Sequence, residues 1–71
     1  MTDVAKVIEI VGSSTQGWED AVQVALDEAS KTIHGITGLE VIDMTGKVDP
    51  SSGQIESYRA TVKIAFGVEH S

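Results

Sequence analysis

The residues of this chain that could do chemistry are mainly carboxylates. Its 71 residues include eleven Asp and Glu, two His and no Cys. Calcium binds oxygen ligands from carboxylates, carbonyls and water, and it needs neither cysteine nor histidine. The composition therefore permits a calcium site and excludes a cysteine-ligated zinc finger.

Two serines are the candidate nucleophiles. Ser13 and Ser14 lie in the segment 11–15, VGSST, which lacks the glycine two places after the serine of a nucleophile elbow. No His–acid pair is spaced to serve them, since His34 is expected at a helix end and His70 near the C-terminus. Helix capping and turn hydrogen bonds explain both serines. We expect no enzymatic activity.

The charge pattern limits the possible partners. The formal net charge is −6, and the five bases are scattered along the chain. A nucleic-acid-binding protein gathers its bases against phosphates, so we expect no such partner. No apolar run approaches the ~18 residues of a membrane helix, and Met1–Asp3 has neither a basic nor an apolar signal segment. We expect a cytoplasmic protein without a membrane partner.

The apolar spacing predicts the elements that position these groups. Apolar residues recur at three- and four-residue steps from Trp18 to His34, which predicts one helix with an apolar stripe, and Gly35 is expected to stop it. The turn 49–53 joins the last two strands. The predicted strands are Val7–Val11, Leu39–Ile42 and Tyr58–Phe66. Residues 1–71 are expected to form one domain, which is small enough to favour oligomerisation.

Connection rules then predict the fold. The first two strands are joined through a helix and run parallel, so the last strand lies antiparallel between them. We expect an α+β, β-α-β-β fold, in which a three-stranded antiparallel sheet with the order first, third, second wraps over one helix. Pairing Val48 with Ile55 sets Val41 beside Val62 on the helix side of the sheet.

The same register predicts the composition of the outer face. It sets Glu40 beside Lys63 and Met44 near Arg59 on that side. This half-apolar, half-charged face predicts a subunit contact, with any ligand site between subunits.

Several segments resemble the dodecin family. They are Val7–Ser14 (VIEIVGSS), Trp18–Val22 (WEDAV), Ala29–Thr32 (ASKT) and Lys63–Phe66 (KIAF). The resemblance extends from Lys6 to Glu69. It implies a hollow homododecamer of β-α-β-β subunits, a class that usually binds flavin.

The chain departs from flavin-binding dodecins at two positions. Those proteins stack the flavin on a tryptophan before the second strand and hold its polar edge with a glutamine after the tyrosine of the last strand. Here Gly38 occupies the first position, and Arg59 follows Tyr58 at the second. Stacking on an aromatic ring is worth about 1–3 kcal/mol, and Trp18 is expected in the helix stripe. Flavin binding is therefore not expected, although Arg59 could hold a phosphate, which leaves a flavin or nucleotide-like ligand as the alternative.

The resemblance then implies the calcium dodecin branch, with metal cations bound at subunit interfaces. Asp49 and Glu56 are the first candidate ligands because they lie in the stretch that departs from flavin-type members; Glu40 and Asp43 follow them. Structural roles compete with this assignment. Asp49 precedes Pro50 as turn openers do, and Glu56 is expected opposite Lys47. No EF-hand loop is present in the sequence.

Overall fold

The computed structural model describes residues 4–68 and confirms the β-α-β-β order. Its elements are β1 (Val4–Ser14), α1 (Trp18–Ser30), β2 (Ile36–Val48) and β3 (Ile55–Val68). The strands are longer than predicted, because the hydrogen-bonded ladder continues beyond the apolar runs at both ends of each strand. His70 lies outside the described residues.

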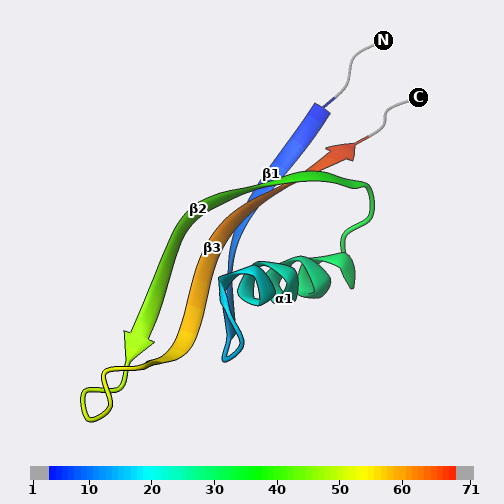
Figure 1. Cartoon of the computed structure of the whole chain (residues 1–71). Coiled ribbons are helices and arrows are strands. Elements are labelled where there is room, and N and C mark those ends of the chain that lie inside the picture. The colour runs from blue at the N-terminus through cyan, green and yellow to red at the C-terminus, as the bar shows by residue number, and fades with distance from the viewer. Residues whose placement is uncertain (1–3, 69–71) are drawn as a thin grey trace.

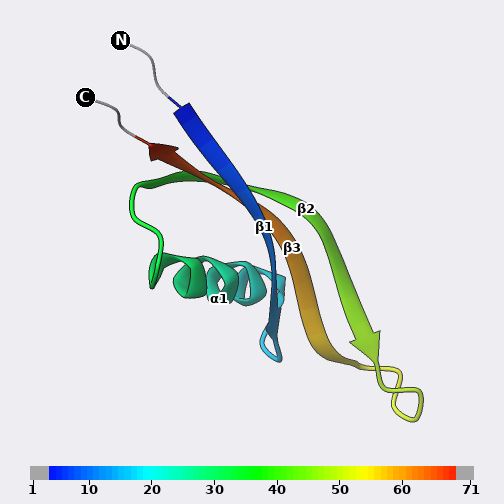
Figure 2. The same cartoon turned by 180° about the vertical axis from the view of Figure 1, so that it is seen from behind.

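The three strands form one sheet in the predicted order β1-β3-β2, with both neighbouring pairs antiparallel. Figures 1 and 2 show α1 on one side of this sheet, with the β2–β3 hairpin extending beyond the helix. Within residues 4–68, no helix is long and apolar enough to cross a membrane.

The predicted hairpin register is confirmed at Val41 and at Val48, and it is wrong by one residue between them. Val48 pairs with Ile55, and Val41 pairs with Val62, as predicted. Between Val41 and Asp43 the register shifts by one residue, which marks Ile42 as the extra residue of a β-bulge. The predicted position of Met44 near Arg59 is therefore wrong.

Met44 lies opposite Ala60, whose side is buried under the helix. Cross-strand partners point to the same face of a sheet, so Met44 belongs to the helix side and not to the outer face.

The helix approaches the sheet closely because small residues meet at the contact. Ala21, Ala25 and Ala29 are buried, and β1 presents Gly12 beneath the first two of them. A Cβ on Gly12 would lie 2.1 Å from the carbonyl oxygen of Ala21. A side chain at this position therefore cannot fit without moving the helix.

The helix covers β1 and β3 more fully than β2. Val62 and Ile64 of β3 are completely buried. Leu39, Val41 and Met44 of β2, on the same face, keep 37–53% of their surface exposed. In the single chain, the helix side of β2 is therefore an exposed apolar surface.

The helix begins at Trp18, as predicted, but no serine caps it. Gly17 is the N-cap and brings no side chain, while the Ser14 hydroxyl accepts a hydrogen bond from the Gln16 amide (2.9 Å) and donates one to Asp20 (2.6 Å). Ser14 therefore organises the preceding turn, and not the cap.

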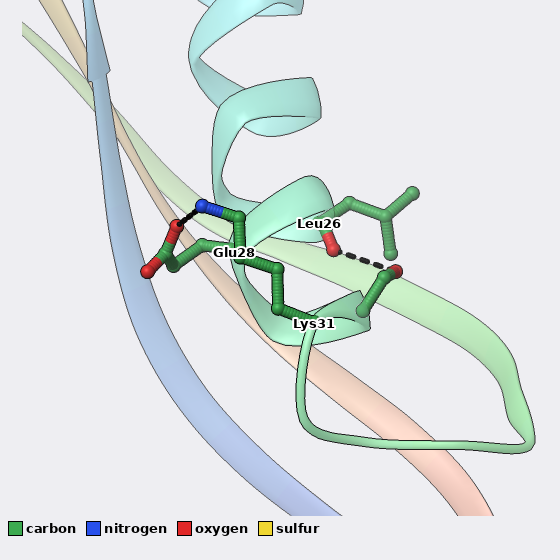
Figure 3. Close-up of polar contacts among 4 residues, drawn as sticks. Leu26, Glu28 and Lys31 are labelled. Carbon is green, nitrogen blue, oxygen red and sulfur yellow. Dashed lines mark hydrogen bonds and ion pairs between the residues drawn. The ribbon is translucent and has the colours of Figure 1, made fainter.

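At its other end the helix finishes at Ser30, four residues before the predicted His34. Ile33 fits the helical spacing of apolar residues but lies in the segment that connects the helix to β2, where it packs against the core. Gly35 has φ +76°, so it turns the chain into β2 and does not end the helix. Figure 3 shows this end, where Lys31 contacts Glu28 at 2.9 Å.

Candidate functional site

Asp49, the first predicted metal ligand, organises the β2–β3 turn. Its Oδ1 accepts a hydrogen bond from the Ser51 amide (2.9 Å), and its Oδ2 accepts one from the Ser52 hydroxyl (3.2 Å). Its backbone amide donates to the Gln54 carbonyl, and its carbonyl accepts from the Gly53 amide, both at 2.8 Å. This is an Asx turn closing a hairpin, which is the structural role that competed with metal binding.

Glu56, the second predicted ligand, forms an ion pair with Lys47. The carboxylate and ammonium are 3.8 Å apart, and the two side chains are 44% and 76% exposed. The paired residue opposite Lys47 is Ser57, because the register shifts once more between Lys47 and Val48. An exposed, long ion pair of this kind contributes little to stability.

Glu40 and Asp43 are brought to the same face of the sheet by the bulge. Glu40 lies opposite Lys63, and Asp43 lies opposite Thr61, with the pair Val41–Val62 between them. Residues three apart in a regular strand point to opposite faces, but the extra Ile42 restores Asp43 to the side of Glu40. Both carboxylates belong to exposed residues. The outer face therefore presents two neighbouring carboxylates.

A third carboxylate lies on the same row. Glu9 of β1 faces Lys63 from the other side, so Lys63 stands between Glu9 and Glu40. Among residues 4–68, no group of three or more acidic, His or Cys side chains is close enough to hold a metal ion. Glu9, Glu40 and Asp43 therefore do not form a metal-binding cluster within the described chain.

The two positions that depart from flavin-type members lie apart on the sheet. Gly38 faces Ala65, and a Cβ built on it would have no atom within 4 Å. Arg59 lies between Ser13 of β1 and Thr45 of β2. In the described residues Arg59 forms no ion pair, and Glu9 of β1 faces Lys63.

The tryptophan is used for packing. The Trp18 indole N–H donates a hydrogen bond to the Thr45 carbonyl (2.8 Å). Its ring meets Tyr58 edge to face, with centroids 4.7 Å apart and planes at 80°. Both residues are half-buried, and Trp18 anchors the helix start to the hairpin.

Among residues 4–68, one titratable group has a clearly shifted pKa. The hydrogen bond and charge of Glu28 raise the pKa of Lys31 above its usual value. This pair lies on the helix, far along the chain from the candidate carboxylates, so it carries no information about a metal site.

A single helix covers one face of a three-stranded antiparallel sheet, and apolar residues stay exposed on the outer face and on the helix side of β2. The dodecin family model matches residues 4–69. The chain belongs to the dodecin family.

Two curated relatives support this assignment. The dodecin of Thermus thermophilus is 31% identical over 71 residues, which covers the whole of both chains. The calcium dodecin of Mycobacterium tuberculosis is 36% identical over 63 residues, which covers 89% of this chain and 86% of the relative.

Solved structures agree with them. A variant of the Thermus dodecin matches with a TM-score of 0.89 and 30% identity, over 97% of this chain and 100% of that one. The calcium dodecin of M. tuberculosis, described as calcium chelating with a novel calcium-binding site, matches with a TM-score of 0.77 and 35% identity, over 96% and 94% of the two chains.

Proposed function

We propose that this chain is a calcium-binding dodecin, a non-enzymatic homododecameric shell that holds metal ions at its subunit interfaces. The observation that carries the proposal is the placement of Glu40 and Asp43 side by side on the outer sheet face. The relationship to a protein named calcium dodecin supports the choice of ion. Gly38 has no aromatic side chain on which a flavin could stack, and this speaks against a flavin carrier.

The proposed assembly is supported by the small number of apolar side chains that one chain buries. In the described residues, Val62 and Ile64 are the largest fully buried side chains. Val7 and Val11 on the outer side keep more than half of their surface exposed. Apolar surface exposed on both faces of a small sheet favours contact with further copies. Light scattering should therefore give a mass about twelve times that of the chain, and a monomer or dimer would contradict this part of the proposal.

The charge of such an assembly favours cation uptake. At −6 per chain, twelve copies carry roughly −72, and bound cations relieve this self-repulsion. Glu40 and Asp43 supply too few oxygens to fill the coordination shell of calcium alone. The remaining ligands would come from water and from a second copy, which accounts for the incomplete cluster in a single chain.

Asp49 and Glu56 become the weaker candidates. Calcium at Asp49 would compete with the Ser51 amide and the Ser52 hydroxyl for its carboxylate oxygens. Calcium at Glu56 would displace Lys47. Glu40 and Asp43 have no hydrogen bond or ion pair of this kind within residues 4–68, so their oxygens are available.

Calorimetric titration of calcium into metal-free assembled protein tests the proposal. Calcium should bind and raise the melting temperature by mass action, and magnesium, which demands a tight octahedron, should do less. Asp43→Asn and Glu40→Gln should abolish most of the calcium heat. The matched control is Glu56→Gln, which removes an equal charge from the same hairpin and should retain binding.

Three outcomes would contradict this account at different points. The absence of calcium heat from the parent would refute the function. Loss of binding in Glu56→Gln, with binding retained in Asp43→Asn, would move the site to the hairpin end. Loss of the assembly in Asp43→Asn without calcium present would show a structural role for that side chain.

A further inference from the structure

One cation lies among the carboxylates of the outer face. Lys63 is at the centre of the rung that crosses all three strands, with Glu9 of β1 on one side and Glu40 of β2 on the other. Asp43 lies opposite Thr61, two residues before Lys63 on β3, so Asp43 is a diagonal neighbour of Lys63. Directly opposed residues have their Cβ atoms about 5 Å apart, and diagonal ones about 7–8 Å. Lys63 is therefore a cross-strand neighbour of all three acids.

The Lys63 ammonium is not fixed to any one of these acids. Among residues 4–68 it forms no ion pair, and Lys63 and its three acidic neighbours are all exposed. A lysine carries its charge on a flexible four-carbon stem, so the ammonium can move between Glu9 and Glu40. Its charge therefore acts on the acids through space, and calcium does not have to break a direct contact in order to bind.

Given the calcium site proposed above, on which this inference rests, we propose that Lys63 sets the calcium affinity of the outer face. In the metal-free protein, the negative charges of Glu9, Glu40 and Asp43 repel one another, and a cation between them offsets that repulsion. Once calcium binds at Glu40 and Asp43, the same ammonium lies beside a divalent cation and repels it. Lys63 thus stabilises the empty site and weakens the filled one.

Arg59 is the other cation near these acids, and its surroundings differ. It lies opposite Thr45 of β2 and Ser13 of β1, and it is diagonal to Asp43. Arg59 therefore neighbours one of the three carboxylates, whereas Lys63 neighbours all of them. Removing the charge of Arg59 should change the calcium affinity less than removing the charge of Lys63.

Calorimetric titration of calcium into the assembled, metal-free protein tests the role of Lys63. Lys63→Gln should bind calcium about three- to tenfold more tightly than the parent, which is the effect of removing one charge about 7 Å from a divalent ion in a water-like dielectric. Added sodium chloride should reduce this difference, because salt screens exposed charges.

The melting temperature should change in the opposite direction. Without calcium, Lys63→Gln should melt about 2–5 °C below the parent, because it loses a cross-strand charge interaction. Saturating calcium should narrow that gap, since the tighter-binding variant gains more stability from the ligand. A purely structural role of Lys63 would lower the melting temperature without tightening calcium binding.

Two further variants separate this position from net charge. Lys31→Gln removes an equal charge at the C-cap of the helix, on the other side of the sheet, and should leave the calcium affinity almost unchanged. Lys63→Arg keeps the charge and should bind calcium as the parent does. Equal effects of Lys63→Gln and Lys31→Gln would overturn the proposed role of Lys63.

The remaining outcomes distinguish this role from the proposed function. The absence of calcium heat from the parent would refute both. Calcium heat from the parent, with no tighter binding by Lys63→Gln, would refute only the role of Lys63. A Lys63→Gln protein that fails to assemble even in saturating calcium would also refute that role, because calcium should replace the lost counter-cation.

Discussion

The close contact between α1 and β1 makes Gly12 the position where a single methyl group should be most damaging. A Cβ there would lie 2.1 Å from the Ala21 carbonyl oxygen and 2.9 Å from the Ala25 Cβ. Contacts between carbon atoms are most favourable at about 3.5–4.0 Å. The obstacle at 2.1 Å is helix backbone, so no side-chain rotation relieves it, and the helix must move away from the sheet.

The size of the effect follows from two opposing terms. Overpacking a core costs about 1–3 kcal/mol, and a backbone clash places Gly12→Ala at the upper end. Replacing glycine by alanine returns about 0.4–1 kcal/mol through the unfolded state. The net loss should be about 2 kcal/mol, which lowers the melting temperature by about 10 °C for a domain of this size.

Thermal unfolding followed by circular dichroism at one fixed protein concentration measures this difference, because assembly makes the melting temperature concentration-dependent. Gly38→Ala is the matched control, a glycine of the same sheet whose added Cβ meets nothing within 4 Å. It should melt at or slightly above the temperature of the parent. A Gly12→Ala protein as stable as the Gly38→Ala protein would refute the close packing of α1 on β1.

Three further predictions concern other parts of the chain. Riboflavin fluorescence should stay almost unquenched by the parent and should be quenched by the double variant Gly38→Trp with Arg59→Gln; tight binding by the parent would contradict the lack of a stacking platform. Asp49→Ala should cost about 1 kcal/mol in chemical denaturation because the Ser51 amide loses its acceptor, whereas Asp49→Asn, which keeps an acceptor oxygen, should cost less. The pKa of Lys31, followed by NMR, should exceed 10.5 and fall in a Glu28→Gln variant. Because the pKa is raised in the folded state, the pair stabilises the fold below the unfolded pKa, and this contribution is lost as the pH rises through the folded pKa. An unchanged pKa in the variant would disprove the contact.

The hairpin shows how far the sequence determines the fold. The turn 49–53 and the alternation of β3 were enough to predict the pairing of Val48 with Ile55 and of Glu40 with Lys63. The bulge at Ile42 was not predicted, although the adjacent apolar pair Val41 and Ile42 breaks the alternation and is a local signal for it.

The helix end and its packing depended on tertiary contacts. Ile33 fits the helical spacing but reaches the core from the connection, so periodicity alone extended the helix too far. Nothing in the sequence around Gly12 indicates that a helix backbone passes directly over it. The contact forms only when the helix packs on the sheet.

The sequence indicated the type of ligand atom at the candidate site, but not which carboxylates lie together. Counting carboxylates indicated an oxygen-ligated cation, but the ranking of Asp49 and Glu56 above Glu40 and Asp43 rested on where the chain departs from flavin-type members. Hydrogen bonds at Asp49 and the bulge before Asp43 reverse that ranking. In our proposal the ligands that complete the site come from other copies of the chain, and the contacts between copies do not follow from the local sequence pattern.

Native mass spectrometry of the decalcified protein, titrated with calcium, tests the central claim most directly because it reports assembly and metal content together. We predict a species of about twelve chains that gains discrete calcium adducts, and an Asp43→Asn species of the same size that gains far fewer. A dodecamer that takes up no calcium, or a monomer that takes up as much as the assembly, would contradict calcium binding between subunits.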